Sequence, residues 1–133
     1  IFDAGSSFKM IPIQPNLISL IKSIPNGLIN GFLRPFPTDI HKLIHLFPLI
    51  ENLVIYGIIA ILIYKLNILK VKLEIEMQNI IFNSIFFVTI LFVITGISTP
   101  VIGALVRYKV PGLIFIIITI NLLYDVLKKN SAQ

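Results

Sequence analysis

The sequence predicts an all-α membrane protein, in which three transmembrane helices are preceded by an amphipathic interfacial helix. Of the 133 residues, 56% are hydrophobic and only 13% are charged, whereas soluble domains carry about a quarter charged residues. The apolar residues form long runs, and the basic residues stand mostly at the ends of those runs, where lipid headgroups lie. The net charge of +5 therefore indicates membrane lipids as partners rather than nucleic acid.

Residues 1–44 are predicted to form an extended lead-in and then the interfacial helix. In "PNLISLIKSIPNGLINGFLRPFP" (15–37) Asn16 could cap a helix, and "RPFP" ends it. Pro25 and Gly27 interrupt the pattern, so we expect a helix lying in the interface, broken near Pro25. Its apolar residues recur at helical spacing: Leu17, Leu20, Ile21, Ile24, Leu28 and Phe32.

Residues 45–133 are predicted to form the transmembrane region, because a helix of ~20 residues crosses the hydrocarbon layer. Pro48 suits the first turn of the first span and Pro111 that of the third. The connection 65–78 alternates charged and apolar residues, which indicates a surface strand or an amphipathic element. The expected spans are about 45–64, 79–98 and 110–127.

The run from Met77 to Val106 contains no ionisable residue and is longer than one span requires. Gly96, Pro100 and Gly103 punctuate its second part. We therefore expect the chain after the second span to bend back along the membrane surface or to form a shallow re-entrant turn.

The predicted topology places the segments 1–44 and 99–109 on one side of the membrane. Basic residues close to the span ends weigh most in setting orientation. They favour a cytoplasmic C-terminus. "IFDAGSSFKM" lacks a signal-peptide pattern and the chain ends in a polar tail, so we expect the C-terminal part of a longer protein. The lysines that carry the orientation are Lys65, Lys70, Lys72, Lys128 and Lys129.

Glu51 lies about one and a half turns, or ~9 Å, inside a span that starts near residue 45. A carboxylate at that depth is usually paired or faces a cavity, which makes Glu51 a candidate for a buried ion pair with Arg34 or Arg107. Alternatively, the span starts near Asn52 and Glu51 lies among headgroups at the helix N-terminus. The uncharged run 52–64 has only 13 residues, which argues against so late a start.

Arg107, Tyr108 and Lys109 are predicted to form a cationic patch that binds a lipid phosphate. The arginine offers a planar fork that suits phosphate, and the lysine adds a point charge. The alternative is that these residues only anchor a span at the interface.

No catalytic residue, metal site or cofactor is predicted. There is no nucleophile–base pair, phosphate-cradling glycine loop or glycosidase-type carboxylate pair, and there is no cysteine. His41 and His45 are four residues apart, but two ligands are unspecific, and we interpret them as interfacial. We expect the side chains of Asn79, Asn83 and Asn121 to form hydrogen bonds with further transmembrane helices, which belong to the same protein or to a partner.

Two segments resemble known membrane proteins. "RYKVPGLIFIIITI" (107–120) resembles the Arg-Tyr-x-x-Pro segment that opens a last membrane helix in GT-C-type, lipid-sugar-dependent glycosyltransferases. "GFLRPFPTDIHKLIHLFPLIENL" (31–53) resembles a segment of large membrane proteins of Bacteroidetes. The resemblance implies the C-terminal transmembrane portion of a cell-envelope glycan or polysaccharide protein in the inner membrane of a bacterium, with Arg107 near the phosphate of a polyprenyl-linked sugar. In that family the catalytic carboxylate lies in an early loop, and this chain has no equivalent.

A second interpretation is a small, non-enzymatic accessory subunit that packs against a larger membrane complex. A transporter fragment that uses Glu51 is a third, although no pair of matching broken helices is visible.

Overall fold

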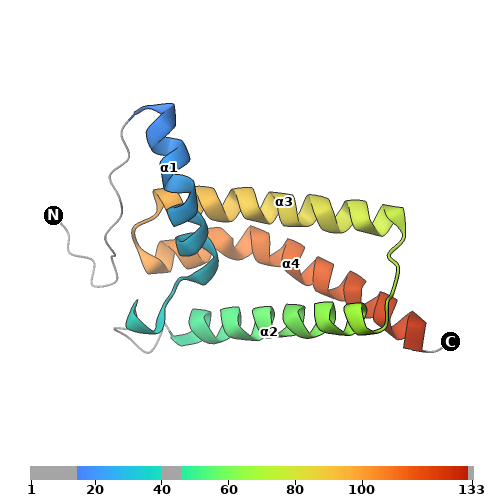
Figure 1. Ribbon diagram of the computed structural model, residues 1–133. Coiled ribbons are helices and arrows are strands. Elements are labelled where there is room, and N and C mark those ends of the chain that lie inside the picture. Colours follow the sequence, from blue (N-terminus) through green and yellow to red (C-terminus); the bar gives the residue numbers. More distant parts are fainter. Residues whose placement is uncertain (1–14, 40–45, 132–133) are drawn as a thin grey trace.

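The computed structural model describes residues 15–39 and 46–131, and it is helical with no strand in those ranges. Three helices are long and apolar enough to cross a membrane: α2 (Leu46–Ile68), α3 (Ile75–Ser98) and α4 (Ile102–Ser131). The shorter apolar helix α1 (Leu17–Leu28) precedes them (Figure 1). The predicted fold class is therefore confirmed.

Helix α1 starts as the sequence predicts and continues further than expected. Asn16 accepts a hydrogen bond from the backbone N–H of Ser19 at 2.6 Å, which satisfies one of the free donors of the first turn. The helix does not break at Pro25 and widens into a π-helical turn, η1 (Ile29–Leu33). Extended backbone at Arg34 then ends it, and a short 3₁₀ helix, η2 (Pro37–Asp39), follows.

The two spans α2 and α3 take up most of the predicted connection 65–78. Only residues 69–74 link them. Helix α2 ends at Ile68, and Lys70, two residues beyond, adopts the left-handed conformation (φ 49°). Its N–H bonds to the Asn67 carbonyl, and that of Val71 bonds to the Leu66 carbonyl. This pattern closes the helix terminus as a Schellman motif, so no surface strand forms.

The predicted bend after the second span is wrong, because α3 and α4 form a helical hairpin joined only by residues 99–101. A helix pairs nearly all of its interior backbone groups, whereas irregular backbone at membrane depth must be covered by protein or water. Gly96 lies inside α3 and Gly103 inside α4. Pro111 also lies inside α4; it cannot donate to the Arg107 carbonyl, yet the helix continues.

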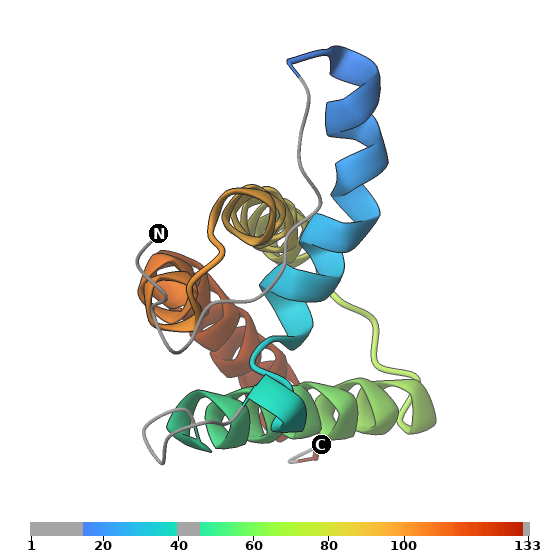
Figure 2. The same cartoon turned by 90° about the vertical axis from the view of Figure 1, so that its left-hand side faces the viewer.

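Of the three spans, α4 contacts both of the others. Helices α3 and α4 lie antiparallel and side by side, α2 packs on α4, and α1 with η1 crosses the end of α3 (Figures 1 and 2). One apolar cluster joins Val88, Phe92 and Ile116, with the Phe32 ring edge-on to Phe92 at 4.9 Å between centroids. A second cluster joins Leu62, Leu123 and Leu127 near the opposite end.

The crossing of α1 over α3 depends on small residues. Ser23, Gly27 and Gly31 recur at intervals of four and are buried. A Cβ on Gly96 of α3 would lie 2.1 Å from the Gly27 carbonyl oxygen, and one on Gly31 would lie 2.1 Å from that of Phe92. Small residues let two membrane helices approach until their backbones touch.

Candidate functional site

A group of polar side chains lies at the end of the spans where α1 crosses. We call it the polar cluster, and it contains Asn30, Arg34, Asp39, Asn52, Tyr56 and Lys109. The extended backbone at Arg34 separates η1 from η2, so this short connection faces the first turns of α2 and α4. The cluster thus joins residues of η1, η2 and the connection between them to residues of α2 and α4.

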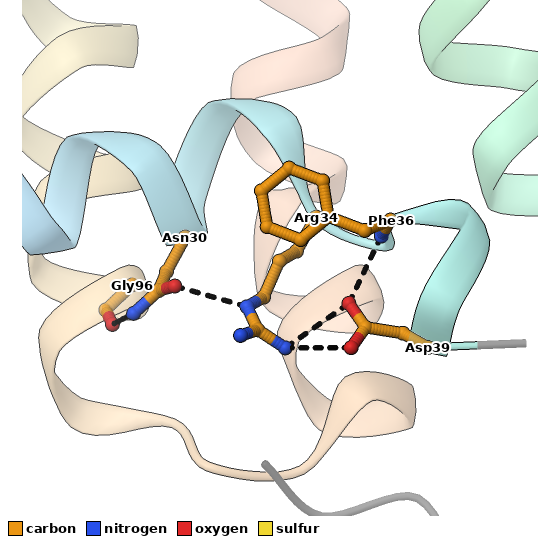
Figure 3. Close-up of polar contacts among 5 residues, drawn as sticks. All are labelled: Asn30, Arg34, Phe36, Asp39 and Gly96. Carbon is orange, nitrogen blue, oxygen red and sulfur yellow. Dashed lines mark hydrogen bonds and ion pairs between the residues drawn. The ribbon is translucent and has the colours of Figure 1, made fainter. Parts of the chain in front are cut away.

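Arg34 and Asp39 form the ion pair of the polar cluster. The arginine Nη1 lies 2.9 Å and 3.0 Å from the two carboxylate oxygens, and its Nε donates to the Asn30 side-chain oxygen at 2.9 Å (Figure 3). The Asp39 carboxylate also accepts the N–H of Phe36 at 2.9 Å. Asn30 in turn donates to the Gly96 carbonyl at 3.2 Å. These bonds fasten the turn after η1 to the end of α3.

The backbone carbonyl of Arg34 joins α2 and α4. It accepts a hydrogen bond from the Lys109 Nζ at 2.7 Å and another from the Asn52 Nδ2 at 3.1 Å. Tyr56, one turn along α2, donates to the Phe32 carbonyl at 2.5 Å. Carbonyls at a helix C-terminus lack helical partners, and the side chains of α2 and α4 supply them here.

Lys109 is only 3% exposed, and its ammonium lies 5.5 Å from the centroid of the Phe92 ring. Arg107 and Tyr108 are exposed on the outer surface of α4. Residues two apart on a helix project about 200° from each other, so the three predicted phosphate ligands do not form one patch. Lys109 turns inward, and Arg107 with Tyr108 faces outward.

The predicted buried ion pair of Glu51 and Arg34 differs from what the structure shows. Arg34 pairs with Asp39, and Glu51 is exposed. Glu51 lies on α2 beside a narrow gap that also borders Lys109, and its charge attracts that ammonium. Glu51 is exposed because α2 buries little of its surface against the other helices, with Leu62 its one buried residue.

The gap between these residues is too small for a substrate. It has a volume of about 10 Å³, and a cavity of roughly that size holds one water at most. Its lining includes Arg34, Glu51, Asn52 and Lys109. The hydrogen bonds of the polar cluster therefore hold the segment η1–η2 against α2, α3 and α4.

Sequence reasoning missed Asn30, Asp39, Asn52 and Tyr56. Asn52 and Tyr56 are four residues apart and therefore share one helix face. Two polar side chains on one face of an apolar span could have indicated that both contact the same neighbouring segment. Asn79, Asn83 and Asn121 are exposed, and their bonding to further helices stays a prediction. His41 and His45 lie outside the described residues, in which no group of three His, Asp or Glu side chains converges on a metal position.

Neither a protein-family model, nor a curated protein, nor a solved structure matches this chain.

Proposed function

We propose that this chain is a non-catalytic membrane portion of a cell-envelope protein and that it binds lipid phosphate through Arg107. The observation that carries the proposal is the outward position of this guanidinium. Arg107 makes no ion pair within the described residues, whereas Lys109 is engaged inside the protein. A planar guanidinium binds two phosphate oxygens at once.

The depth of Arg107 supports a headgroup partner. Residues 110–124 of α4 carry no charge, and Arg107 stands one turn before them. When this stretch lies in hydrocarbon, the guanidinium lies at the level of lipid phosphates. Tyr108 is 56% exposed beside it, and interfacial tyrosines have one apolar and one wet end. The resemblance of residues 107–120 suggests a polyprenyl phosphate used in glycan assembly in the inner membrane of a bacterium.

The test is binding of a polyprenyl phosphate to the purified full chain in detergent. We expect Arg107→Gln to weaken binding roughly tenfold, because it removes a charge-assisted bidentate contact. Arg107→Lys should recover part of the loss, since it restores the charge without the fork. Lys129→Gln, which removes one charge at the opposite end of α4, should leave binding unchanged. If Arg107→Gln binds as well as the parent chain, Arg107 only anchors the helix.

The accessory-subunit interpretation is a second candidate, supported by the exposure of α2. Leu62 is the one buried residue of this helix, and Gly57 has no atom within 4 Å of its would-be Cβ. We propose that a transmembrane helix of a larger complex packs against this face of α2.

Gly57→Leu tests this second candidate. The substitution fills open space and should leave the thermal stability of the isolated chain unchanged. If a helix packs closely at Gly57, the bulky side chain should remove the larger species seen by native mass spectrometry of protein extracted in mild detergent. Gly103→Leu, also in open space but on α4, is the matched control. An unchanged mass distribution in the Gly57 variant would show that lipid covers this face.

A further inference from the structure

The last turns of α2 and α4 border an open cavity at the end of the spans opposite the polar cluster. Its volume is about 350 Å³, in contrast to the water-sized gap at the other end. Three of its lining side chains are polar: Lys65 of α2, and Tyr124 and Lys128 of α4. Leu62 and Leu127 also line it and are buried, at 6% exposure each. The cavity thus has an apolar floor below two ammonium groups and a phenol.

We propose that this cavity binds the phosphate of an anionic amphiphile, with the phosphate at Lys65 and Lys128 and the hydrocarbon against the leucine floor. Two ammonium groups supply the positive charge for a phosphate diester, and the Tyr124 hydroxyl supplies a further donor. The leucines would be superfluous for a fully hydrated anion. The combination of charge above and hydrocarbon below is that of a phospholipid at the membrane surface.

The local charge pattern agrees with an anionic occupant. Asp125 follows Tyr124 directly but is not among the lining residues, because consecutive helix residues project about 100° apart. The described residues that line the cavity include no carboxylate. The lysines also stand in the last turns of their helices, where cations offset the helix dipole. The helix dipole explains why lysines occur at these two positions. It does not explain why an apolar cavity lies between them.

The position along the spans places the cavity at headgroup depth. Lys65 directly follows the uncharged run 52–64, and Lys128 lies one turn beyond the run 110–124. This site is independent of the proposal for Arg107, which lies at the other end of α4.

The experiment compares two double variants of the full chain with equal net charge. Lys65→Gln with Lys128→Gln removes both lining cations, and Lys72→Gln with Lys129→Gln removes two cations of the same region that do not line the cavity. Each protein is titrated in detergent with phosphatidylglycerol and, separately, with phosphatidylcholine, and bound lipid is counted by native mass spectrometry.

We expect the first double variant to bind phosphatidylglycerol at least tenfold more weakly, at about fivefold per lysine, and the matched variant to change less than twofold. Tyr124→Phe keeps every charge and should weaken binding roughly threefold, so the test does not depend on the double variant alone. Equal weakening in both double variants, or none in the first, would overturn the proposal, since binding would then follow diffuse charge.

Inorganic phosphate added as a competitor identifies the source of the phosphate group. Failure to displace phosphatidylglycerol at millimolar concentration supports a lipid, because the leucine floor then contributes to binding. Displacement at concentrations equal to the lipid would overturn the lipid as occupant and assign the site to a soluble phosphate.

Discussion

Gly96 determines how closely α1 can lie on α3. A Cβ at this position would meet backbone atoms, the Gly27 carbonyl oxygen at 2.1 Å and the Gly31 nitrogen at 2.6 Å. Backbone atoms cannot rotate away as the end of a flexible side chain can. The two helices must therefore separate for any larger residue to enter.

We expect Gly96→Ala to destabilise the protein by about 1–3 kcal/mol, the usual cost of forcing extra atoms into a packed contact. Gly57→Ala is the matched control, because its Cβ enters open space inside α2. There the better helix propensity of alanine should stabilise by up to about 1 kcal/mol. Thermal unfolding followed by circular dichroism in one detergent measures both. A Gly96→Ala protein as stable as the Gly57→Ala protein would contradict the close crossing.

The sequence predicts where Lys109 lies along the span but not that its side chain points into the protein. Composition and position place Arg107, Tyr108 and Lys109 at a membrane surface, and the structure agrees that they occupy one end of a span. Which cation turns inward depends on the phase of α4 against α3 and on a carbonyl acceptor at Arg34, 75 positions away in the sequence. Nothing in the local pattern specifies that partner.

At the scale of the helices, the sequence predicts which segments are helical better than where they end. The three spans follow from apolar runs and the length of a bilayer. The start of α4 at Ile102 was missed because Gly96, Pro100 and Gly103 resemble loop residues by the rules for soluble proteins. Membrane helices tolerate glycine and proline more readily, and in this chain Pro100 alone of the three lies in the turn.

Helix α2 depends on few polar bonds at its first turns. The Asn52 and Tyr56 side chains tie it to the carbonyls of Arg34 and Phe32. We expect Asn52→Leu with Tyr56→Phe to loosen this end and to cost about 2 kcal/mol, at ~1 kcal/mol per hydrogen bond.

The chain has no cysteine, so spin labels at introduced cysteines can report this loosening. Ile18→Cys in α1 and Ile58→Cys in α2 both replace exposed side chains. The distance distribution between the labels should be narrow in the parent chain and broader in the double variant. Asn67→Leu with Tyr64→Phe, near the other end of α2, is the control. An unbroadened distribution would mean that the apolar contacts alone hold α2.

At the scale of the whole molecule, the spans divide it into two ends. Helix α1, the start of α2 and the hairpin turn lie at one end, whereas α2 and α4 finish at the other (Figure 1). This division agrees with the sides predicted from the sequence. The orientation in the membrane stays a prediction, because basic residues occur at both ends.

Thiol labelling of intact cells tests the orientation. We expect Leu17→Cys in α1 to react with a membrane-impermeant maleimide added outside, and Asn67→Cys and Asn130→Cys to react only after the cells are opened. The reason is that two lysine-rich span ends favour the cytoplasm. Reversed labelling would invert the topology, and equal labelling of all three positions would contradict an odd number of spans.

The inward position of Lys109 changes where lipid meets charge along α4. Because Lys109 is buried and bound to the Arg34 carbonyl, the exposed charges that flank the middle of this helix are Arg107 and Asp125. The 17 residues between them, 108–124, cover about 25 Å of helix, against ~30 Å of hydrocarbon. The uncharged run of α2, 52–64, covers only about 20 Å, so we expect the bilayer to thin beside α2 more than beside α4.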